Sequence, residues 1–161
     1  MIKINRKVEY ALMVLMSMKN KGNSDLTTAR EVCDAFHCPF DTTAKVMQQM
    51  NTAGILQSHK GVKGGYTLSK DLNTLSYLDL AELIEGKSFI MDCHHMDGPQ
   101  KPCEMMNSCN IALPIRRLND YLMMIFNSLT IGEILSDDNL LALKILPLKK
   151  VENCPLTKAT V

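Results

Sequence analysis

Residues 28–68, TAREVCDAFHCPFDTTAKVMQQMNTAGILQSHKGVKGGYTL, decide the fold, because signals for two helices and a hairpin follow one another within them. Thr28 and Glu31 have the spacing of a capping box, in which each side chain bonds the backbone N–H of the other residue. A short helix is therefore predicted to begin after Thr28. It ends at the run His37-Cys38-Pro39, since the residue before a proline is disfavoured in the α-helical conformation.

A longer helix follows at once. Asp41 is predicted to cap its start, and Gly54 supplies the left-handed conformation at its end. Its inward face is formed by apolar residues at helical spacing, namely Ala44, Val46, Met47 and Met50. Two short helices joined by a short turn predict a helix-turn-helix.

Two short strands are predicted in residues 55–68, around Gly61, Gly64 and Gly65. A hairpin in this position is the wing of a winged helix. Upstream, residues 5–19 predict a helix with one apolar stripe, formed by Val8, Ala11, Leu12, Leu15 and Met18. This order of elements predicts a winged helix-turn-helix, a mainly α fold with a small β-hairpin wing.

Two further helices are predicted beyond the wing. Ser76 caps the first, and Gly86 ends it. The second covers residues 112–128 and carries more apolar side chains than one small domain needs to cover. It is therefore a candidate dimerisation helix.

The chain divides into three predicted parts. Residues 1–72 form a winged helix-turn-helix DNA-binding domain. Residues 73–135 contain a helix, a cysteine cluster loop and the dimerisation helix, followed by a short helix that begins with a second capping box at Thr130 and Glu133. Residues 136–161 are a C-terminal extension that we expect to be partly disordered.

The net charge of +1 conceals an asymmetry. Residues 1–70 carry ten Lys and Arg against five Asp and Glu, whereas residues 71–161 carry eight against twelve. A basic first half favours a polyanionic partner for that half. No apolar run approaches the ~20 residues that span a bilayer, and the start lacks the small-residue cleavage site of a secretory signal, so we expect a cytoplasmic protein without a membrane partner.

Three of the six cysteines, Cys93, Cys103 and Cys109, cluster in DCHHMDGPQKPCEMMNSC, residues 92–109. Glycine and prolines interrupt this segment, so three thiols in it indicate a metal-binding loop rather than core. The other three are scattered. Cys33 is predicted to be a small core residue of its helix, Cys38 lies at the turn before a proline, and Cys154 lies in the tail.

The helix-turn-helix also predicts which residues face DNA. A recognition helix enters the major groove, while a wing reaches the backbone or the minor groove. The residues assigned to the helix are Thr42, Thr43, Lys45, Gln48 and Gln49, and those assigned to the wing are His59, Lys60 and Lys63. Thr28, at a helix N-terminus, is a candidate phosphate contact. The alternative for the wing residues is that they are exposed polar residues of a tight hairpin.

Taken together, several stretches resemble the winged-helix regulators of the IscR and NsrR type, the Rrf2 family: KINRKVEYAL, KGVKGGYTLSKD, LSYLDLAELIEG, the cysteine loop and TIGEIL. The resemblance covers roughly residues 1–135. It implies a homodimeric transcription regulator, in our interpretation a repressor, that binds a palindromic double-stranded DNA operator. Where the cysteines are present, it also implies an iron–sulfur cluster, either 2Fe–2S or 4Fe–4S. Lys60 matches a family arginine that inserts into the minor groove.

The resemblance also directs the search for a fourth ligand beside the three thiolates. The histidine that IscR-like members use is replaced here by Ala112, and the acidic ligand that NsrR-like members donate from the opposite subunit matches Glu9. A carboxylate binds iron more weakly than a thiolate, so it would be displaced first when the cluster is oxidised, nitrosylated or lost. Release of Glu9 would then rotate the DNA-binding heads. His94 and His95 compete for this role, and Glu9 is otherwise a surface carboxylate.

Two other interpretations of the cysteines stay open. Three thiolates plus a histidine form a common zinc shell, which would make a zinc-stabilised winged helix. Without metal, Cys103 and Cys109 would form a disulfide switch. An enzyme is not expected, because no Ser/His/Asp arrangement, phosphate loop or paired carboxylate motif accompanies the cysteines.

Overall fold

The computed structural model describes residues 4–22, 25–61, 64–86 and 109–136. Most of the cysteine loop and of the C-terminal extension therefore lies outside the described residues, and so does Lys63. The described chain is mainly α-helical with one antiparallel hairpin, which confirms the predicted fold class. The elements in order are α1 (Arg6–Lys21), α2 (Ala29–Phe36), α3 (Phe40–Thr52), β1 (Leu56–His59), β2 (Gly65–Leu68), the 3₁₀ turn η1 (Leu72–Thr74), α4 (Tyr77–Glu85), α5 (Ala112–Ser128) and α6 (Ile131–Ile134).

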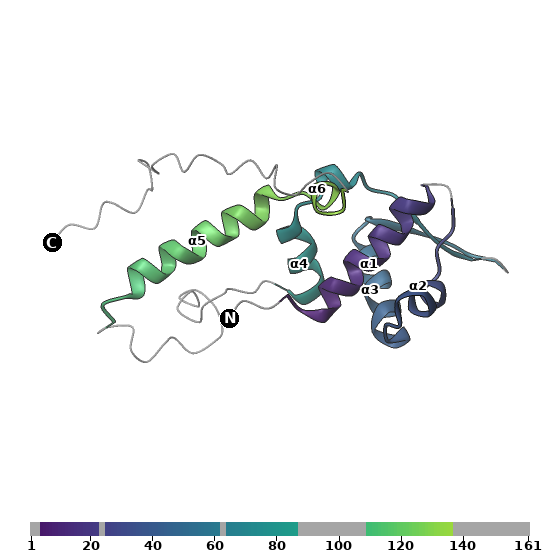
Figure 1. The fold of residues 1–161 in the computed structure, drawn as a ribbon, viewed down its shortest axis with the longest axis horizontal. Coiled ribbons are helices and arrows are strands. Elements are labelled where there is room, and N and C mark those ends of the chain that lie inside the picture. Colours follow the sequence, from purple (N-terminus) through teal and green to yellow (C-terminus); the bar gives the residue numbers. More distant parts are fainter. Residues whose placement is uncertain (1–3, 23–24, 62–63, 87–108, 137–161) are drawn as a thin grey trace.

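Helix α1 is the centre of the core, because α2, α3, α4 and β2 all pack against it (Figure 1). Its predicted apolar stripe is largely buried, but Leu12 stays half-exposed, whereas Tyr10 and Val14 are buried as well. A helix covered from several directions buries more than one narrow stripe. The rest of the core comes from residues of the other elements, including Val32, Val46, Met47, Met50, Leu56, Leu80, Ile84 and Ile131.

The helix-turn-helix is formed by α2 and α3, as predicted. The turn between them passes through His37, whose φ of 55° places a non-glycine residue in the left-handed region and ends α2. The predicted cap of α3 at Asp41 is wrong, because the helix already starts at Phe40 and Pro39 is its N-cap. The Pro39 carbonyl accepts the first helical bond, from Thr43 N at 3.0 Å. Asp41 lies in the first turn, where its negative charge stabilises the helix by interacting with the positive end of the helix dipole.

The wing is the antiparallel pair β1–β2, with Leu56 opposite Leu68 and His59 opposite Gly65. It does not project freely from the body, because Thr27 and Tyr66 exchange two backbone hydrogen bonds of 2.9 Å each. This bridge ties β2 to the segment that leads into α2. The hairpin is therefore held close to the first helix of the helix-turn-helix.

The second half of the described chain is joined to the first through α4, which packs against α1 and α3 on one side and α5 on the other. The predicted caps are confirmed here: Ser76 accepts from Asp79 N at 3.0 Å, and Thr130 and Glu133 form a full capping box. Helix α5 has the predicted bounds and extends away from the other helices in Figure 1. Within the described residues, no helix is long and apolar enough to cross a membrane.

Candidate nucleic-acid interface

A hollow on the surface brings together three elements of the winged helix: the N-terminus of α2, the exposed side of α3 and strand β2. Its lining consists of Thr28, Ala29, Arg30, Phe40, Ala44, Gln48 and Tyr66. Two of the predicted DNA-facing residues, Thr28 and Gln48, thus share one concave surface although twenty residues separate them. The N-terminus of a helix presents free backbone N–H groups, which attract anions such as phosphate.

Arg30 is a charged residue at this hollow, and the sequence analysis did not assign it to the interface. It is exposed, and its guanidinium lies 5.6 Å from the centre of the Phe40 ring, in cation–π geometry. Phe40 keeps 47% of its surface exposed at the start of α3. The stacked ring holds the guanidinium beside the α2 N-terminus. No local sequence signal predicts this pair, because it depends on how α2 and α3 cross.

A second hollow lies along the other side of α3, between that helix, the start of α1 and α4. It is lined by Lys7, Thr42, Lys45, Val46, Gln48, Gln49, Thr52, Ala53 and Leu83. Lys45, Gln48 and Gln49 are exposed and Thr42 is half-exposed, so their side chains are available to a partner. Gln48 borders both hollows. Four of the polar residues of α3 predicted to face DNA, namely Thr42, Lys45, Gln48 and Gln49, therefore line one hollow together with Lys7 of α1.

Thr43 does not belong to this surface, and its assignment as a DNA-facing residue is corrected. Its side chain is 0% exposed. The hydroxyl donates to the carbonyl oxygen of Pro39 at 2.9 Å and lies 3.3 Å from the Cys38 sulfur. A threonine one turn into a helix satisfies its hydroxyl in this way when it points into the core.

In the wing, His59 and Lys60 are exposed, as predicted. The His59 ring makes a hydrogen bond of 2.9 Å with the Thr67 hydroxyl across the hairpin, which fixes the imidazole over the wing surface. Lys63 lies outside the described residues. Close backbone packing shapes the hairpin at its glycines, since a Cβ on Gly64 would lie 2.8 Å from the His59 carbonyl oxygen.

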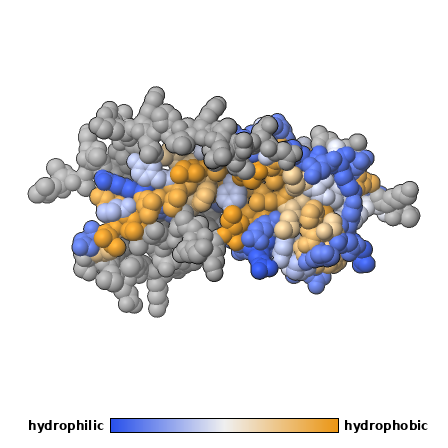
Figure 2. Space-filling model, in the orientation of Figure 1, coloured by the Kyte–Doolittle hydropathy of each residue, from blue (hydrophilic) through white to orange (hydrophobic). Residues whose placement is uncertain are grey.

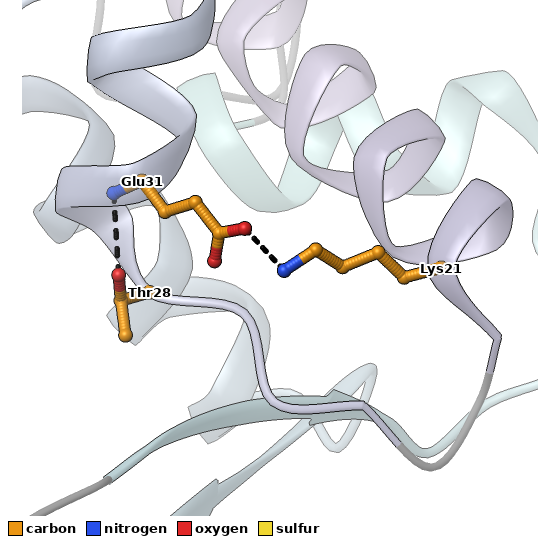
Figure 3. A network of polar contacts seen from close by, with 3 residues as sticks. All are labelled: Lys21, Thr28 and Glu31. Carbon is orange, nitrogen blue, oxygen red and sulfur yellow. Dashed lines mark hydrogen bonds and ion pairs between the residues drawn. The ribbon is translucent and has the colours of Figure 1, made fainter.

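The start of α2 shows a network that differs from the predicted capping box (Figure 3). Thr28 accepts a hydrogen bond from the Glu31 backbone N–H at 3.2 Å, as a box requires. The Glu31 carboxylate, however, pairs with Lys21 at the end of α1 instead of returning to the Thr28 backbone. The cap is therefore half-formed, because a tertiary ion pair takes the carboxylate that would complete it.

Of the predicted cluster ligands, the structure describes Cys109 and Glu9, whereas Cys93, Cys103, His94 and His95 lie outside the described residues. Cys109 is half-buried just before α5, and Glu9 is exposed on α1. Within the described ranges, no three His, Cys, Asp or Glu residues are grouped as a metal site requires. Three thiolates and a carboxylate are a donor set that suits iron.

Tyr77, at the start of α4, packs against α5 through Phe126. Its ring lies 5.3 Å from that of Phe126, centre to centre, at 56°. Burial raises the pKa of Tyr77, and the negative charges of Glu85 and Glu9 raise it further.

Helix α5 carries an exposed apolar surface, seen as the orange band along the helix in Figure 2. The large apolar residues exposed on it or directly before it are Ile111, Leu113, Leu118, Tyr121, Met124 and Ile125, each with between 40% and 56% of its surface exposed. Contiguous apolar surface of this kind marks an interaction site.

Known proteins share both the sequence pattern and the fold. Residues 4–137 match the model of the Rrf2 family, described as an iron-dependent transcriptional regulator. The chain is 23% identical over 137 residues to the HTH-type transcriptional repressor NsrR of Streptomyces coelicolor, covering 84% of this chain and 89% of that protein. The fold is similar to that of CymR, the global cysteine regulator of B. subtilis, with a TM-score of 0.64, 19% identity and coverage of 84% and 97%. It is also similar to that of T. potens IscR, with a TM-score of 0.59, 13% identity and coverage of 83% and 86%. These names are those of regulators, not of enzymes.

Proposed function

The chain belongs to the Rrf2 family of transcriptional regulators, and from this premise we propose that it is a homodimeric repressor whose affinity for a palindromic operator is controlled by an iron–sulfur cluster. The observation that carries the DNA-binding part is the joint surface of α2, α3 and the wing. Thr28, Gln48 and Tyr66 come from three elements and line one hollow.

On DNA, Lys45, Gln48 and Gln49 of α3 would enter the major groove, where glutamine side chains can pair with adenine. Thr42, half-exposed near the start of the same helix, would contribute its methyl group to a thymine contact. The N-terminus of α2, with Thr28 and Arg30, would hold a backbone phosphate. In the wing, His59, Lys60 and Lys63 would contact the backbone or the minor groove. Those side chains that reach a base edge would specify the sequence, and those that contact phosphates would position the protein on the duplex.

We propose that the chain dimerises through α5, which lies in the second predicted part of the chain, residues 73–135. The exposed apolar residues of α5 would be removed from water by the same surface of a second copy. A palindromic operator then follows, because two symmetry-related recognition helices read two symmetry-related half-sites.

The cluster is proposed to be bound by Cys93, Cys103 and Cys109 of one chain and by Glu9 of the partner subunit. Glu9 is exposed and lies on α1, which packs directly against α3. When bound, the cluster supplies redox and nitric-oxide reactivity. Loss of the weak carboxylate ligand would change the restraint on α1 and, through the α1–α3 contact, the position of the recognition helix.

Anaerobic purification followed by selection from a random duplex pool tests the proposal. We expect brown protein that contains iron and sulfide, and selected duplexes with a two-fold symmetric motif. Affinity for the selected duplex should differ between cluster-loaded protein and apo-protein. Colourless protein that contains zinc would exclude the iron–sulfur cluster in favour of a structural zinc site. Metal-free protein that responds to peroxide through Cys103 and Cys109 would exclude it in favour of a disulfide switch.

Glu9→Gln tests the fourth ligand, and Glu85→Gln is its matched control, since both carboxylates act on Tyr77. We expect Glu9→Gln to change the visible spectrum and to speed cluster loss, while Glu85→Gln leaves both unchanged. Identical spectra, cluster lifetimes and DNA affinities for Glu9→Gln and the wild type would exclude Glu9 and return the search to His94 and His95.

A further inference from the structure

Two thiols outside the cysteine loop are in contact with each other. The sulfurs of Cys33, on α2, and Cys38, in the turn before α3, lie 3.4 Å apart. Both are free thiols in the structure. Because Cys33 lies on α2 and Cys38 lies in the turn that follows it, a bond between them would act on the geometry of that turn.

The Cys38 sulfur is also in contact with the recognition helix. The Thr43 hydroxyl of α3 lies 3.3 Å from it, within a fully buried environment. Next to the pair, His37 has a φ of 55°, a conformation that non-glycine residues adopt infrequently. A displacement of the Cys38 sulfur would therefore change the contact with Thr43 of α3 and the backbone at His37, which ends α2.

The two thiols differ in their access to solvent. Cys33 is half-buried and thus open to a small reagent, whereas Cys38 is 8% exposed. Burial raises the pKa of the Cys33 thiol, a hydrogen bond with Thr43 offsets part of this effect, and the adjacent Cys38 raises the pKa again, so Cys33 is predominantly protonated at neutral pH. The pair is therefore a stable dithiol at rest, which reacts through the small thiolate fraction.

We propose that Cys33 and Cys38 form a second oxidation site, at which a hydroperoxide produces an intramolecular disulfide that lowers the affinity of the protein for DNA. The Cys33 thiolate attacks the outer oxygen of the hydroperoxide, the O–O bond breaks, and the alcohol leaves after taking up a proton, which forms a sulfenic acid at Cys33. The Cys38 sulfur then attacks the Cys33 sulfur, the S–O bond breaks, and water leaves. The two thiols are oxidised by two electrons, and the hydroperoxide is reduced by two.

The effect on DNA follows from the contacts around the pair. A covalent bond requires the two sulfurs to come closer than their 3.4 Å contact, which shifts Cys38 relative to α2 and disturbs its 3.3 Å contact with the Thr43 hydroxyl of α3. The start of α3, where Phe40 stacks on Arg30, would then move relative to the N-terminus of α2. The formation of the disulfide does not depend on the proposed function, whereas its effect on operator affinity rests on it.

The test treats the full-length protein with cumene hydroperoxide, blocks the remaining thiols, and maps disulfides by peptide mass spectrometry. We expect a Cys33–Cys38 linkage with the loss of two hydrogens, reversed by dithiothreitol. It should also form in the Cys93→Ser, Cys103→Ser, Cys109→Ser variant, which removes the cluster thiols. Two alkylated thiols at Cys33 and Cys38 after oxidation, or linkage of either to another cysteine, would overturn the proposal, whether or not the protein binds DNA.

The second arm measures affinity for the selected duplex before and after oxidation. In the Cys93→Ser, Cys103→Ser, Cys109→Ser background, which has no cluster to respond, we expect at least about a tenfold loss on oxidation. Adding Cys33→Ala should abolish this loss, and adding the matched control Cys154→Ala should leave it unchanged. Circular dichroism verifies that Cys33→Ala is folded, and Cys33→Ser replaces it if it is not. A mapped disulfide that leaves affinity unchanged would refute the switch, while a failure to select any duplex would refute the proposed function alone.

Discussion

Thr27 and Tyr66 exchange two backbone hydrogen bonds, each with an N···O distance of 2.9 Å, and thereby bond the wing to the start of the helix-turn-helix. Gly65, next to Tyr66, makes this approach possible, since a Cβ there would lie 3.1 Å from the Thr27 carbonyl oxygen and 3.3 Å from the Leu26 Cβ. The position of the wing relative to α2 is thus set by backbone contact.

Gly65→Ala should displace the wing from α2 by a few tenths of an ångström, because the added methyl group meets backbone atoms. We expect the free energy of unfolding to fall by about 1 kcal/mol, measured by urea denaturation, with weaker binding to the selected duplex. Ser58→Ala, on the exposed side of β1, is the control and should change neither quantity. Equal affinities for Gly65→Ala and the wild type would show that the wing position does not matter for binding.

Substitutions of Thr28 should separate the helix cap from the phosphate contact. Thr28→Ala removes the bond to the Glu31 N–H and should lower the free energy of unfolding by about 1 kcal/mol. Thr28→Asp can still accept that bond, so stability should be retained, but its charge should repel a phosphate and weaken DNA binding. Thr28→Ser should retain both properties. If Thr28→Asp binds DNA like the wild type, the α2 N-terminus is not a phosphate site.

Arg30→Ala should weaken binding to all duplexes by a similar factor and should reduce the slope of log affinity against log salt by about 1, as the loss of one phosphate contact requires. Phe40→Leu should have part of this effect, because the guanidinium loses the ring that holds it. Arg117→Ala, which removes an exposed arginine of α5, is the matched control. An unchanged salt slope for Arg30→Ala would place Arg30 outside the interface.

Leu118→Asp should convert the proposed dimer into a monomer, since a carboxylate would have to be buried against the apolar surface of the second copy. We expect the dimer dissociation constant, measured by sedimentation equilibrium, to rise by at least about tenfold. Asn127→Asp adds the same charge nine residues later, on the opposite side of α5, and is the control. A Leu118→Asp protein that remains dimeric would remove α5 from the proposed interface.

Tyr77 should make the protein sensitive to alkali. Its pKa in the folded state is raised above the unfolded value, so its contribution to stability is complete below about pH 10 and is lost as the pH rises through the folded-state pKa. The free energy of unfolding should therefore decrease more steeply above about pH 10 in the wild type than in Tyr77→Phe. Tyr66→Phe, which changes a half-exposed tyrosine of β2 outside the proposed dimer surface, serves as the control. Parallel pH profiles for the wild type and Tyr77→Phe would contradict the assigned environment.

Much of the candidate interface could be predicted because a helix-turn-helix and a hairpin are local structures. Lys45, Gln48, Gln49, His59 and Lys60 are exposed in the structure as the sequence suggested. Thr43 was misplaced because it was assigned to the surface by its polar side chain, although it lies three and four residues before Val46 and Met47, on the inward face of α3. Arg30 was missed because its partner Phe40 lies on another helix.

The sequence by itself determined where most elements begin and end. Ser76 and Thr130 bond N–H groups within one turn, and Gly54 and Gly86 adopt positive φ beside the helices that they end, so these features need no distant partner. The apolar periodicity likewise determined that α1 would be buried and that α5 would expose an apolar surface.

The tertiary structure alone decided how these elements meet. The crossing of α2 and α3 brings Arg30 to Phe40, and the packing of α1 beside α2 takes the Glu31 carboxylate from the Thr28 cap to Lys21. Such contacts depend on the angle and distance between two helices, which the packing of the shared core fixes. A pattern within one element carries no information on that angle, so it can predict a helix but not the partner of a side chain on it.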